Sequence, residues 1–226
     1  MSHFSKARAT ASGFTLAEIL VVIAIIVSLV ALVIPLNRKL RDRSYEVKCS
    51  NNLRNIGVAS MLFGTDNNNK IPSTTHQRRL GGKSWSVTLK EYVPSIDFRC
   101  PMDGDKNRPY SYLINDFLTQ NPAGAPELNY SYFHRVVAPE QTFLFAEAHD
   151  QYTSSDHFHF SEYNGLAIPI EVFATQVAHD RHSGSANFLF VDGHVECLNK
   201  EEIEKRLQNP QRSFVDPLPR TTLNSQ

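Results

Sequence analysis

A run of apolar residues from Leu16 to Leu36 constrains this chain more than any other feature. Only Glu18, Ser28 and Pro35 interrupt a stretch that otherwise consists of Leu, Ile, Val and Ala. At about 1.5 Å of rise per residue, a helix of this length spans a hydrocarbon layer of about 30 Å. The run therefore predicts a membrane-spanning helix.

A cleavable secretory signal is the main alternative for this run. Its apolar region would cover about 7–15 residues and would precede a small-residue cleavage site. The run is longer and is followed by PLNRKLRDRSYE, which offers no such site. Basic residues flank the run unevenly, with Lys6 and Arg8 before it and four more between positions 38 and 43. By the positive-inside rule alone, this asymmetry places the C-terminal part in the cytoplasm.

The helical pattern continues beyond the run. Apolar side chains recur mostly at three- and four-residue steps, at Leu36, Leu40, Val47, Leu53, Ile56, Ala59 and Leu62. This spacing is typical of an amphipathic helix. We therefore expect one helix over residues 14–64, membrane-embedded over 14–36 and amphipathic over 37–64. Pro35 should loosen or kink it because proline lacks a backbone donor. Gly64 and the asparagines at 67–69 should end it.

The remainder predicts a small globular domain. Residues 65–84 read as a connecting loop, residues 85–208 as a head and residues 209–226 as a loose, polar tail. QTFLFAEA and SANFLFVDGHVECL are the best strand candidates, with Asp192-Gly193 as a hairpin turn whose two positions both need positive φ. NKEEIEKRL reads as a helix capped by Asn199. The expected fold is α+β: a long N-terminal helix packed on a small antiparallel sheet.

Composition narrows the possible partners. The chain carries 23 basic and 23 acidic residues, so no overall field favours nucleic acid, and no nucleic-acid partner is expected. Three cysteines, Cys49, Cys100 and Cys197, allow one disulfide and a leftover thiol, and the sequence does not choose among the three pairings. They form no CxxC pair, which disfavours a thiolate zinc site or a thioredoxin-like motif.

Glu18 is the unusual residue of the apolar run. A carboxylate costs about 2.5–3.5 kcal/mol at the centre of a membrane helix and less near its end, and it calls for a cationic partner. The run itself offers none. Cleavage between Gly13 and Phe14 would create an amine with a pKa of about 7.7–8.0, one helical turn before Glu18. That amine could pair with Glu18 of the same or a neighbouring chain.

The stretch GFTLAEIL, followed by the aliphatic run, resembles the prepilin leader of type IV pilins and type II secretion pseudopilins. The resemblance implies that a membrane prepilin peptidase removes residues 1–13 and that the new N-terminal Phe14 is methylated. Glu18 matches the glutamate that steers subunit docking in this family, and Pro35 matches its helix-loosening proline.

The same resemblance implies a location and a topology. The chain would be a single-pass protein of the bacterial inner (cytoplasmic) membrane, with its N-terminus cytoplasmic before processing and its head outside. This topology overrides the charge count. Its partners would be the peptidase/methyltransferase, further copies of the chain and other pseudopilins, and subunits would leave the membrane to enter a filament.

Three further stretches, CSNNLRNIG, CPMDGDKNRPYSYLIN and RHSGSANFLFVDGHVE, resemble bacterial pilin-like proteins with a C-terminal H-x9-DG domain. Here His182 precedes Asp192-Gly193 by nine residues. The resemblance implies an envelope subunit of the pseudopilin kind. Simpler interpretations exist for the same residues: a hairpin turn at Asp192-Gly193, and a helix face on which Leu53 and Ile56 pack against the sheet while Gly57 allows close approach.

The histidines raise a metal site as an alternative. Six of them fall late in the chain: His149, His157, His159, His179, His182 and His194. With neighbouring carboxylates such as Asp180 they could hold zinc, or a loop could hold calcium as in major pseudopilins, although that ligand pattern is not recognisable here. Exposed loop histidines, or His182 bonded to the backbone near Asp192, are the favoured explanation. We expect no metal and no cofactor.

No GxSxG, P-loop or HExxH motif is present, and no cysteine has an obvious base, so we expect no catalytic residues and no enzyme. The sequence favours a structural filament subunit. Two alternatives remain: a membrane-anchored binding protein that does not polymerise, with or without a bound metal, and a metal-dependent envelope enzyme.

Overall fold

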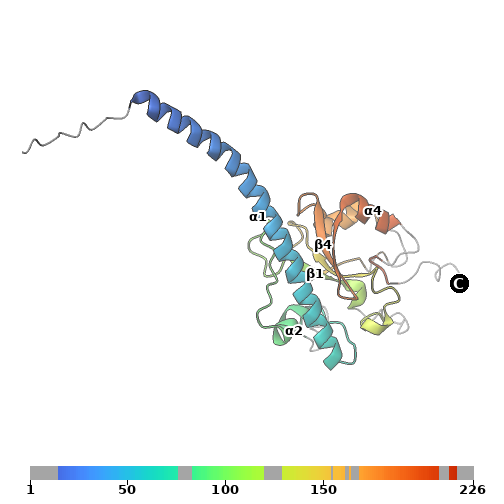
Figure 1. Ribbon diagram of the computed structural model, residues 1–226. Helices are drawn as coiled ribbons and strands as arrows, with labels where there is room; N and C mark the ends of the chain where they lie inside the picture. Colours follow the sequence, from blue (N-terminus) through green and yellow to red (C-terminus); the bar gives the residue numbers. More distant parts are fainter. Residues whose placement is uncertain are drawn as a thin grey trace, which may run out of the picture. The chain divides into compact units, whose positions relative to one another are not determined.

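One helix, α1, runs from Leu16 to Asp66 (Figure 1). The computed structural model describes residues 15–75, 83–119, 129–153, 155–160, 163, 168–208 and 214–217. The long helix expected over 14–64 is present, and its helical backbone continues through position 35. The expected leader, with Gly13 and Phe14, lies outside the described residues.

The helix ends later than expected, because Gly64 lies inside it. A Cβ at Gly64 would stand 2.9 Å from the ring of Phe133, so the glycine serves close packing rather than termination. Asn68 and Asn69 have φ values of 55° and 62°, and the amide of Asn69 donates to the carbonyl of Gly64. Asparagine tolerates this left-handed conformation, which lets the chain leave the helix.

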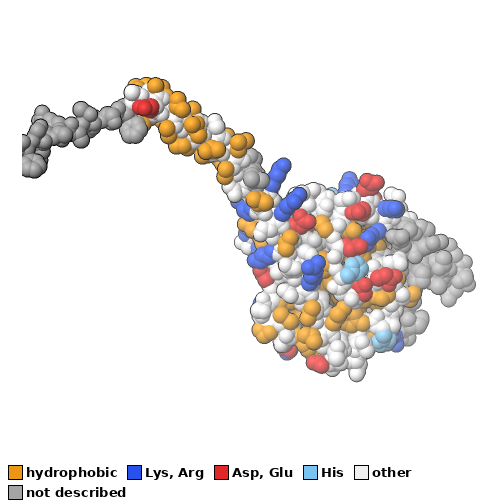
Figure 2. All heavy atoms as spheres, viewed as in Figure 1, with side chains coloured by type: hydrophobic (Ala, Val, Ile, Leu, Met, Phe, Trp, Pro, Cys, Tyr) orange, Lys and Arg blue, Asp and Glu red, His pale blue; other side chains and the backbone are white. Residues whose placement is uncertain are grey.

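The described part of the chain divides between Arg41 and Asp42 into two compact units. In the first unit, α1 is long and apolar enough to cross a membrane by length and composition. Its large apolar side chains from Leu16 to Ile34 are exposed, and Figure 2 shows them as a nearly continuous hydrophobic surface. The second unit, here called the head, begins at Asp42 and includes the last part of α1.

The head is a mixed α+β domain. After α1 come α2 (Trp85–Tyr92), β1 (Tyr112–Asn115), η2 (Asp116–Leu118), η4 (Phe133–Arg135), β2 (Phe143–Glu147), β3 (His157–Phe158), α3 (Ile170–Gln176), β4 (Ser185–Phe190), β5 (Val195–Asn199) and α4 (Lys200–Gln208). The strands form a five-stranded sheet in the order β3-β1-β2-β4-β5. All neighbouring pairs are antiparallel except β1 and β3, which run parallel. The antiparallel sheet expected from the sequence is therefore present with one parallel edge.

One face of the sheet packs against α1 and α2. Leu53 and Ile56 of α1 are fully buried in a core shared with Trp85 and with strand residues that include Phe145 and Leu189. A Cβ at Gly57 would lie 2.9 Å from Leu189, so the glycine allows the helix to approach β4 closely. These contacts confirm the helix face predicted from the sequence.

The predicted apolar stripe of α1 was wrong at three positions. Leu40, Val47 and Leu62 are exposed. Ala59 is buried as predicted, and the buried line also includes Cys49, Asn52 and Ser60, which the pattern did not include. These residues fit the stripe because Cys49 forms a disulfide and the Ser60 hydroxyl donates to the carbonyl of Ile56.

The opposite face of the sheet carries an aromatic core. Phe143 is in ring contact with Phe158, Phe173, Phe188 and Phe214. Phe214 and Val215 are buried, and the amide of Phe143 donates to the carbonyl of Phe214. The expectation of a loose tail from residue 209 was therefore wrong at 214–217. Burial of Phe214 and Val215 holds this segment in place, because the two side chains cover the aromatic core.

The hairpin predicted at Asp192-Gly193 is present between β4 and β5. Its loop has three residues rather than two, since the amide of Gly193 donates to Phe190 and that of Phe190 to His194. Only Gly193 has a positive φ, of 95°, which is the arrangement of a type I turn followed by a glycine bulge. Asn199 caps α4 as predicted: it accepts from the amide of Glu202, whose carboxylate accepts from the amide of Asn199.

Candidate functional site

The first turn of α1 gives Glu18 a partner that the sequence did not suggest. Thr15 precedes the helix, and both its amide and its hydroxyl donate to Oε2 of Glu18 at 2.8 Å. The amide of Glu18 donates back to the Thr15 hydroxyl at 3.3 Å. This is a capping box, which satisfies donors that a helix leaves free at its start. This partner is neither a cation nor part of the apolar run, so the prediction that the run itself offers Glu18 no cationic partner stands beside it.

The cap leaves part of the carboxylate free for another role. Both hydrogen bonds from Thr15 use Oε2 of Glu18, and within the described residues no hydrogen bond is seen at Oε1. Of the other predicted residues of this region, Gly13 and Phe14 lie outside the described chain, and Pro35 is described only as part of the α1 backbone.

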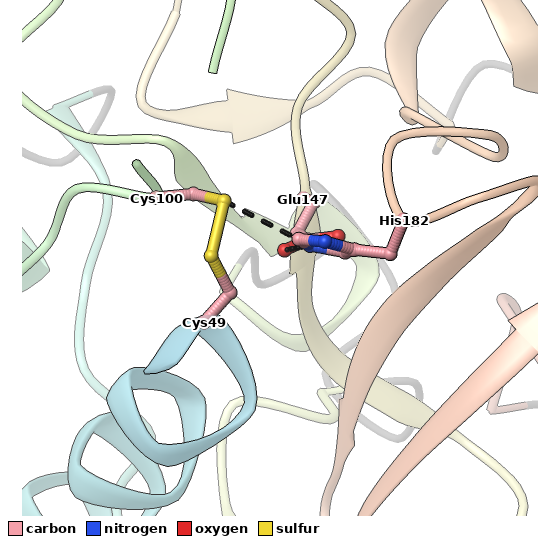
Figure 3. A group of neighbouring side chains, drawn as sticks. All are labelled: Cys49, Cys100, Glu147 and His182. Atoms are coloured by element: carbon pink, nitrogen blue, oxygen red, sulfur yellow. Dashed lines mark hydrogen bonds and ion pairs between the residues drawn. A yellow bond between two sulfur atoms is a disulfide. The ribbon is translucent and has the colours of Figure 1, made fainter. Parts of the chain in front are cut away.

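A second candidate site lies inside the head, where four chemically active side chains meet (Figure 3). Cys49 of α1 and Cys100, in the loop before β1, form a disulfide with their Cα atoms 5.2 Å apart. This selects one of the three pairings that the sequence left open. Glu147, at the end of β2, and His182, in the turn before β4, lie beside it.

We call these four residues the Cys-Glu-His centre. Nε2 of His182 lies 2.7 Å from Oε1 of Glu147 and 3.8 Å from Sγ of Cys100. Both side chains of the His–Glu pair are fully buried. The ligand-type atoms of all four residues lie within 4.8 Å of one another. Burying an ionisable pair costs several kcal/mol of desolvation, so such a pair marks a candidate functional site.

Neighbouring residues orient the centre. Oε2 of Glu147 accepts from the backbone amide of Asn187 at 3.1 Å, and the Cys100 amide donates to the hydroxyl of Ser111. The hydroxyl of Tyr112 donates to the carbonyl of Cys49. Burial of this side chain raises its pKa well above the ordinary value, and the charge of Glu147 raises it further. The centre is thus held by both the sheet and α1.

The three residues of the H-x9-DG motif do not meet in one site. His182 precedes β4, whereas Asp192 and Gly193 follow it, so the motif brackets the strand. Asp192 instead pairs with His194 at 2.6 Å on the exposed hairpin. The alternative in which His182 bonds to the backbone near Asp192 was therefore wrong, because its ring turns toward β2.

The remaining late histidines are dispersed. His157 bonds Asp156 at 2.8 Å, and its ring lies 4.5 Å from that of His159, which bonds the hydroxyl of Tyr152. His149 accepts from the amide of Gln151. Among the described residues, the only group with metal-ligand spacing that includes a histidine is the Cys-Glu-His centre.

A cluster of aspartates in the head is paired with two arginines. Arg108 lies 3.3 Å from Asp103 and 3.5 Å from Asp105, and Arg181 lies 2.5 Å from Asp150. Burial lowers the pKa of Arg108 despite these acids. Burial raises the pKa of Asp150, but hydrogen bonds from Arg181 and the Gly104 amide lower it further than burial raises it. The two guanidinium groups therefore neutralise the carboxylates of this cluster.

The third cysteine stands apart from the centre. Cys197 lies on β5 as a free, exposed residue. Partial burial of the thiol and the nearby carboxylate of Glu46 raise its pKa to about 11. Because the thiolate is the reactive form, this thiol is weakly nucleophilic near neutral pH.

Comparison with known proteins adds no relative: no family model, no curated protein and no solved structure matches this chain. The class that fold and site define is therefore an α+β domain that carries a long apolar N-terminal helix.

Proposed function

We propose that the chain is a structural subunit of the type IV pilin or type II secretion pseudopilin kind, in which α1 anchors the subunit in the membrane and then packs into a filament. The observation that carries the proposal is the first half of α1. Its apolar side chains from Leu16 to Ile34 are exposed all round the helix, with one carboxylate in the first turn.

Such a surface needs an apolar environment. Burial of each Leu, Ile or Val side chain is worth about 1.5–3 kcal/mol, so a helix exposing a continuous set of them is not stable in water. Lipid can cover it in the membrane, and neighbouring copies of the helix can cover it in a filament. The proposal uses both environments in succession.

Glu18 supplies the specificity of assembly in this proposal. Cleavage after Gly13 would leave the capping box intact, because Thr15 follows the cleavage site. The new amine of Phe14 could then pair with the free Oε1 of Glu18 on a neighbouring copy. Charged pairs are strong where water is excluded, and an unpaired acid there is costly. The pairing therefore favours one register between copies.

The head would face the outside and make lateral contacts. Location in a bacterial inner membrane, processing by a prepilin peptidase and partnership with other pseudopilins all belong to this proposal. The role is structural rather than catalytic. The non-polymerising membrane anchor remains the alternative to be excluded.

Two substitutions at Glu18 separate capping from charge pairing. Glutamine can still accept from Thr15, as in other capping boxes, whereas alanine cannot. We expect both Glu18→Gln and Glu18→Ala to insert in the membrane but to fail to form filaments, measured by shearing and by in-cell cross-linking between copies. Ser28→Ala is the matched control, since Ser28 only bonds the carbonyl of Ala24 within the helix. Filaments formed by Glu18→Gln would contradict charge pairing, and the absence of wild-type cross-links would favour the lone anchor.

A further inference from the structure

The Cys-Glu-His centre has the composition of a metal site when its disulfide is open. Two thiolates, one imidazole nitrogen and one carboxylate are ligands that zinc binds in four-coordinate tetrahedral sites. In the oxidised protein the two sulfurs are bonded to each other. The centre therefore has two chemically distinct states, depending on the redox state of Cys49 and Cys100.

We propose that the reduced head binds one zinc ion through Cys49, Cys100, Glu147 and His182, and that disulfide and metal exclude each other. The site would form in chains that bind zinc before the Cys49–Cys100 disulfide forms, or instead of forming it. Neither the membrane anchor nor the filament role is needed for it.

The geometry fits with small adjustments. Zinc bond lengths of about 2.0–2.3 Å in a tetrahedron place sulfur and nitrogen about 3.6 Å apart. Sγ of Cys100 and Nε2 of His182 are 3.8 Å apart. The nitrogen and oxygen ligands would be separated by about 3.3 Å in the same tetrahedron, compared with 2.7 Å between His182 and Glu147 now. A small opening of the His–Glu pair, and of the sulfurs once reduced, admits the ion.

The supporting groups also fit. Oε2 of Glu147 accepts from the backbone amide of Asn187, and Oε1 lies against His182 while also accepting from the Asn187 side-chain amide at 3.4 Å. Nδ1 of His182 is buried and has no hydrogen-bond partner in the described part of the chain. It can carry the ring proton while Nε2 binds metal, but it lacks the acceptor that orients most metal-bound histidines. A buried His–Glu pair with a purely structural role would not need two cysteine sulfurs beside it, so the presence of both sulfurs favours a metal site.

A dithiol or a phosphine can reduce the Cys49–Cys100 disulfide. Two electrons and two protons convert the disulfide to the two thiols, and the reductant is oxidised. Zinc entry then displaces both thiol protons to solvent, and the Nε2 proton of His182 passes to solvent or to Nδ1. Re-oxidation by a small-molecule disulfide, which takes up two electrons and leaves as two thiols, forms the sulfur–sulfur bond, removes two ligands and releases the ion.

The test is metal binding by the full chain in detergent, with and without phosphine reduction under anaerobic conditions. We expect about one Zn²⁺ per reduced chain, less than a tenth of that in the oxidised chain, and a thiolate-to-metal charge-transfer band with Co²⁺. His182→Ala and Glu147→Gln should each weaken binding by at least the roughly 10–100-fold that loss of an outer-shell partner costs, because each removes a ligand itself. Cys197→Ala and His194→Ala are matched controls and should bind like wild type.

Three results would overturn the proposal: no extra metal on reduction, binding unchanged in His182→Ala, or binding lost in Cys197→Ala. If the centre variants fail to fold, X-ray absorption on zinc-loaded wild type decides. Two sulfur and two nitrogen or oxygen ligands support the site, and any other ligand set refutes it.

Discussion

Removal of the Cys49–Cys100 disulfide should destabilise the head by an amount that follows from its position in the chain. The two cysteines are 51 residues apart. In the chain-entropy model, such a cross-link removes roughly 14 cal/mol/K from the unfolded state, which is about 4 kcal/mol at 25 °C. For a domain of this size, each kcal/mol shifts the melting temperature by about 2–4 °C, so the double variant Cys49→Ala/Cys100→Ala should melt about 8–16 °C lower.

Tryptophan fluorescence provides a specific assay. Trp85 is the only tryptophan of the chain and is fully buried, with its indole N–H donating to the carbonyl of Asp156. Its emission therefore reports unfolding of the head, even in detergent. Cys197→Ala is the control and should melt like wild type, because that residue is exposed and unpaired with another cysteine. A loss below about 2 °C in the double variant, or an equal loss in the control, would refute the pairing or its role.

Two further predictions concern the head. Phe143→Ala should destabilise it by about 3–5 kcal/mol in denaturant titration, because the ring contacts four other phenylalanines and leaves a cavity; a cost below 1 kcal/mol would contradict the aromatic core. Burial raises the pKa of Asp156, but hydrogen bonds from His157, Ser84 and Thr75 outweigh it, so the folded pKa lies below the ordinary 3.8. The stabilisation that ionised Asp156 gives the folded head is therefore complete above the ordinary pKa of 3.8, and it is lost as the pH falls through the lowered pKa of the folded protein. Asp156→Asn should lower the free energy of unfolding by about 1.5–3 kcal/mol at pH 7. Below a pH of about 4, the stability of the variant should fall less steeply than that of wild type, as measured by tryptophan fluorescence. An equally steep fall in both proteins would contradict this role of Asp156.

The elements with strong local signals could be predicted from the sequence. The apolar run gave α1, Asp192-Gly193 gave the β4–β5 hairpin, and Asn199 gave the start of α4. In each case the signal lies within a few residues of the feature that it predicts. The class of fold followed from these parts.

Features that depend on distant contacts could not be predicted in the same way. The short helix α2 owes its place to Trp85, which packs between loop and strand residues far along the chain. Phe214 lies in a polar, proline-containing stretch, and only its distant contacts with the aromatic core show that it is buried. Likewise the parallel pairing of β3 with β1 joins two residues to partners 43 positions earlier, without any local pattern.

The buried centre was missed although one signal was present. Glu147 is an acid in the otherwise apolar stretch FLFAEA, much as Glu18 is an acid in the membrane run. An acid within a buried strand calls for a partner, and His182 is that partner. The spacing of the H-x9-DG motif instead drew attention toward Asp192, because sequence distance does not show that a strand separates the two residues.

Mass spectrometry of the N-terminus of the protein extracted from bacterial membranes tests the proposed role most directly. If the chain is a processed pilin-like subunit, the mature protein begins at Phe14 and carries one additional methyl group on its amine. An intact Met1, or a start at any residue other than Phe14, would contradict processing after Gly13 and with it the pairing of that amine with Glu18.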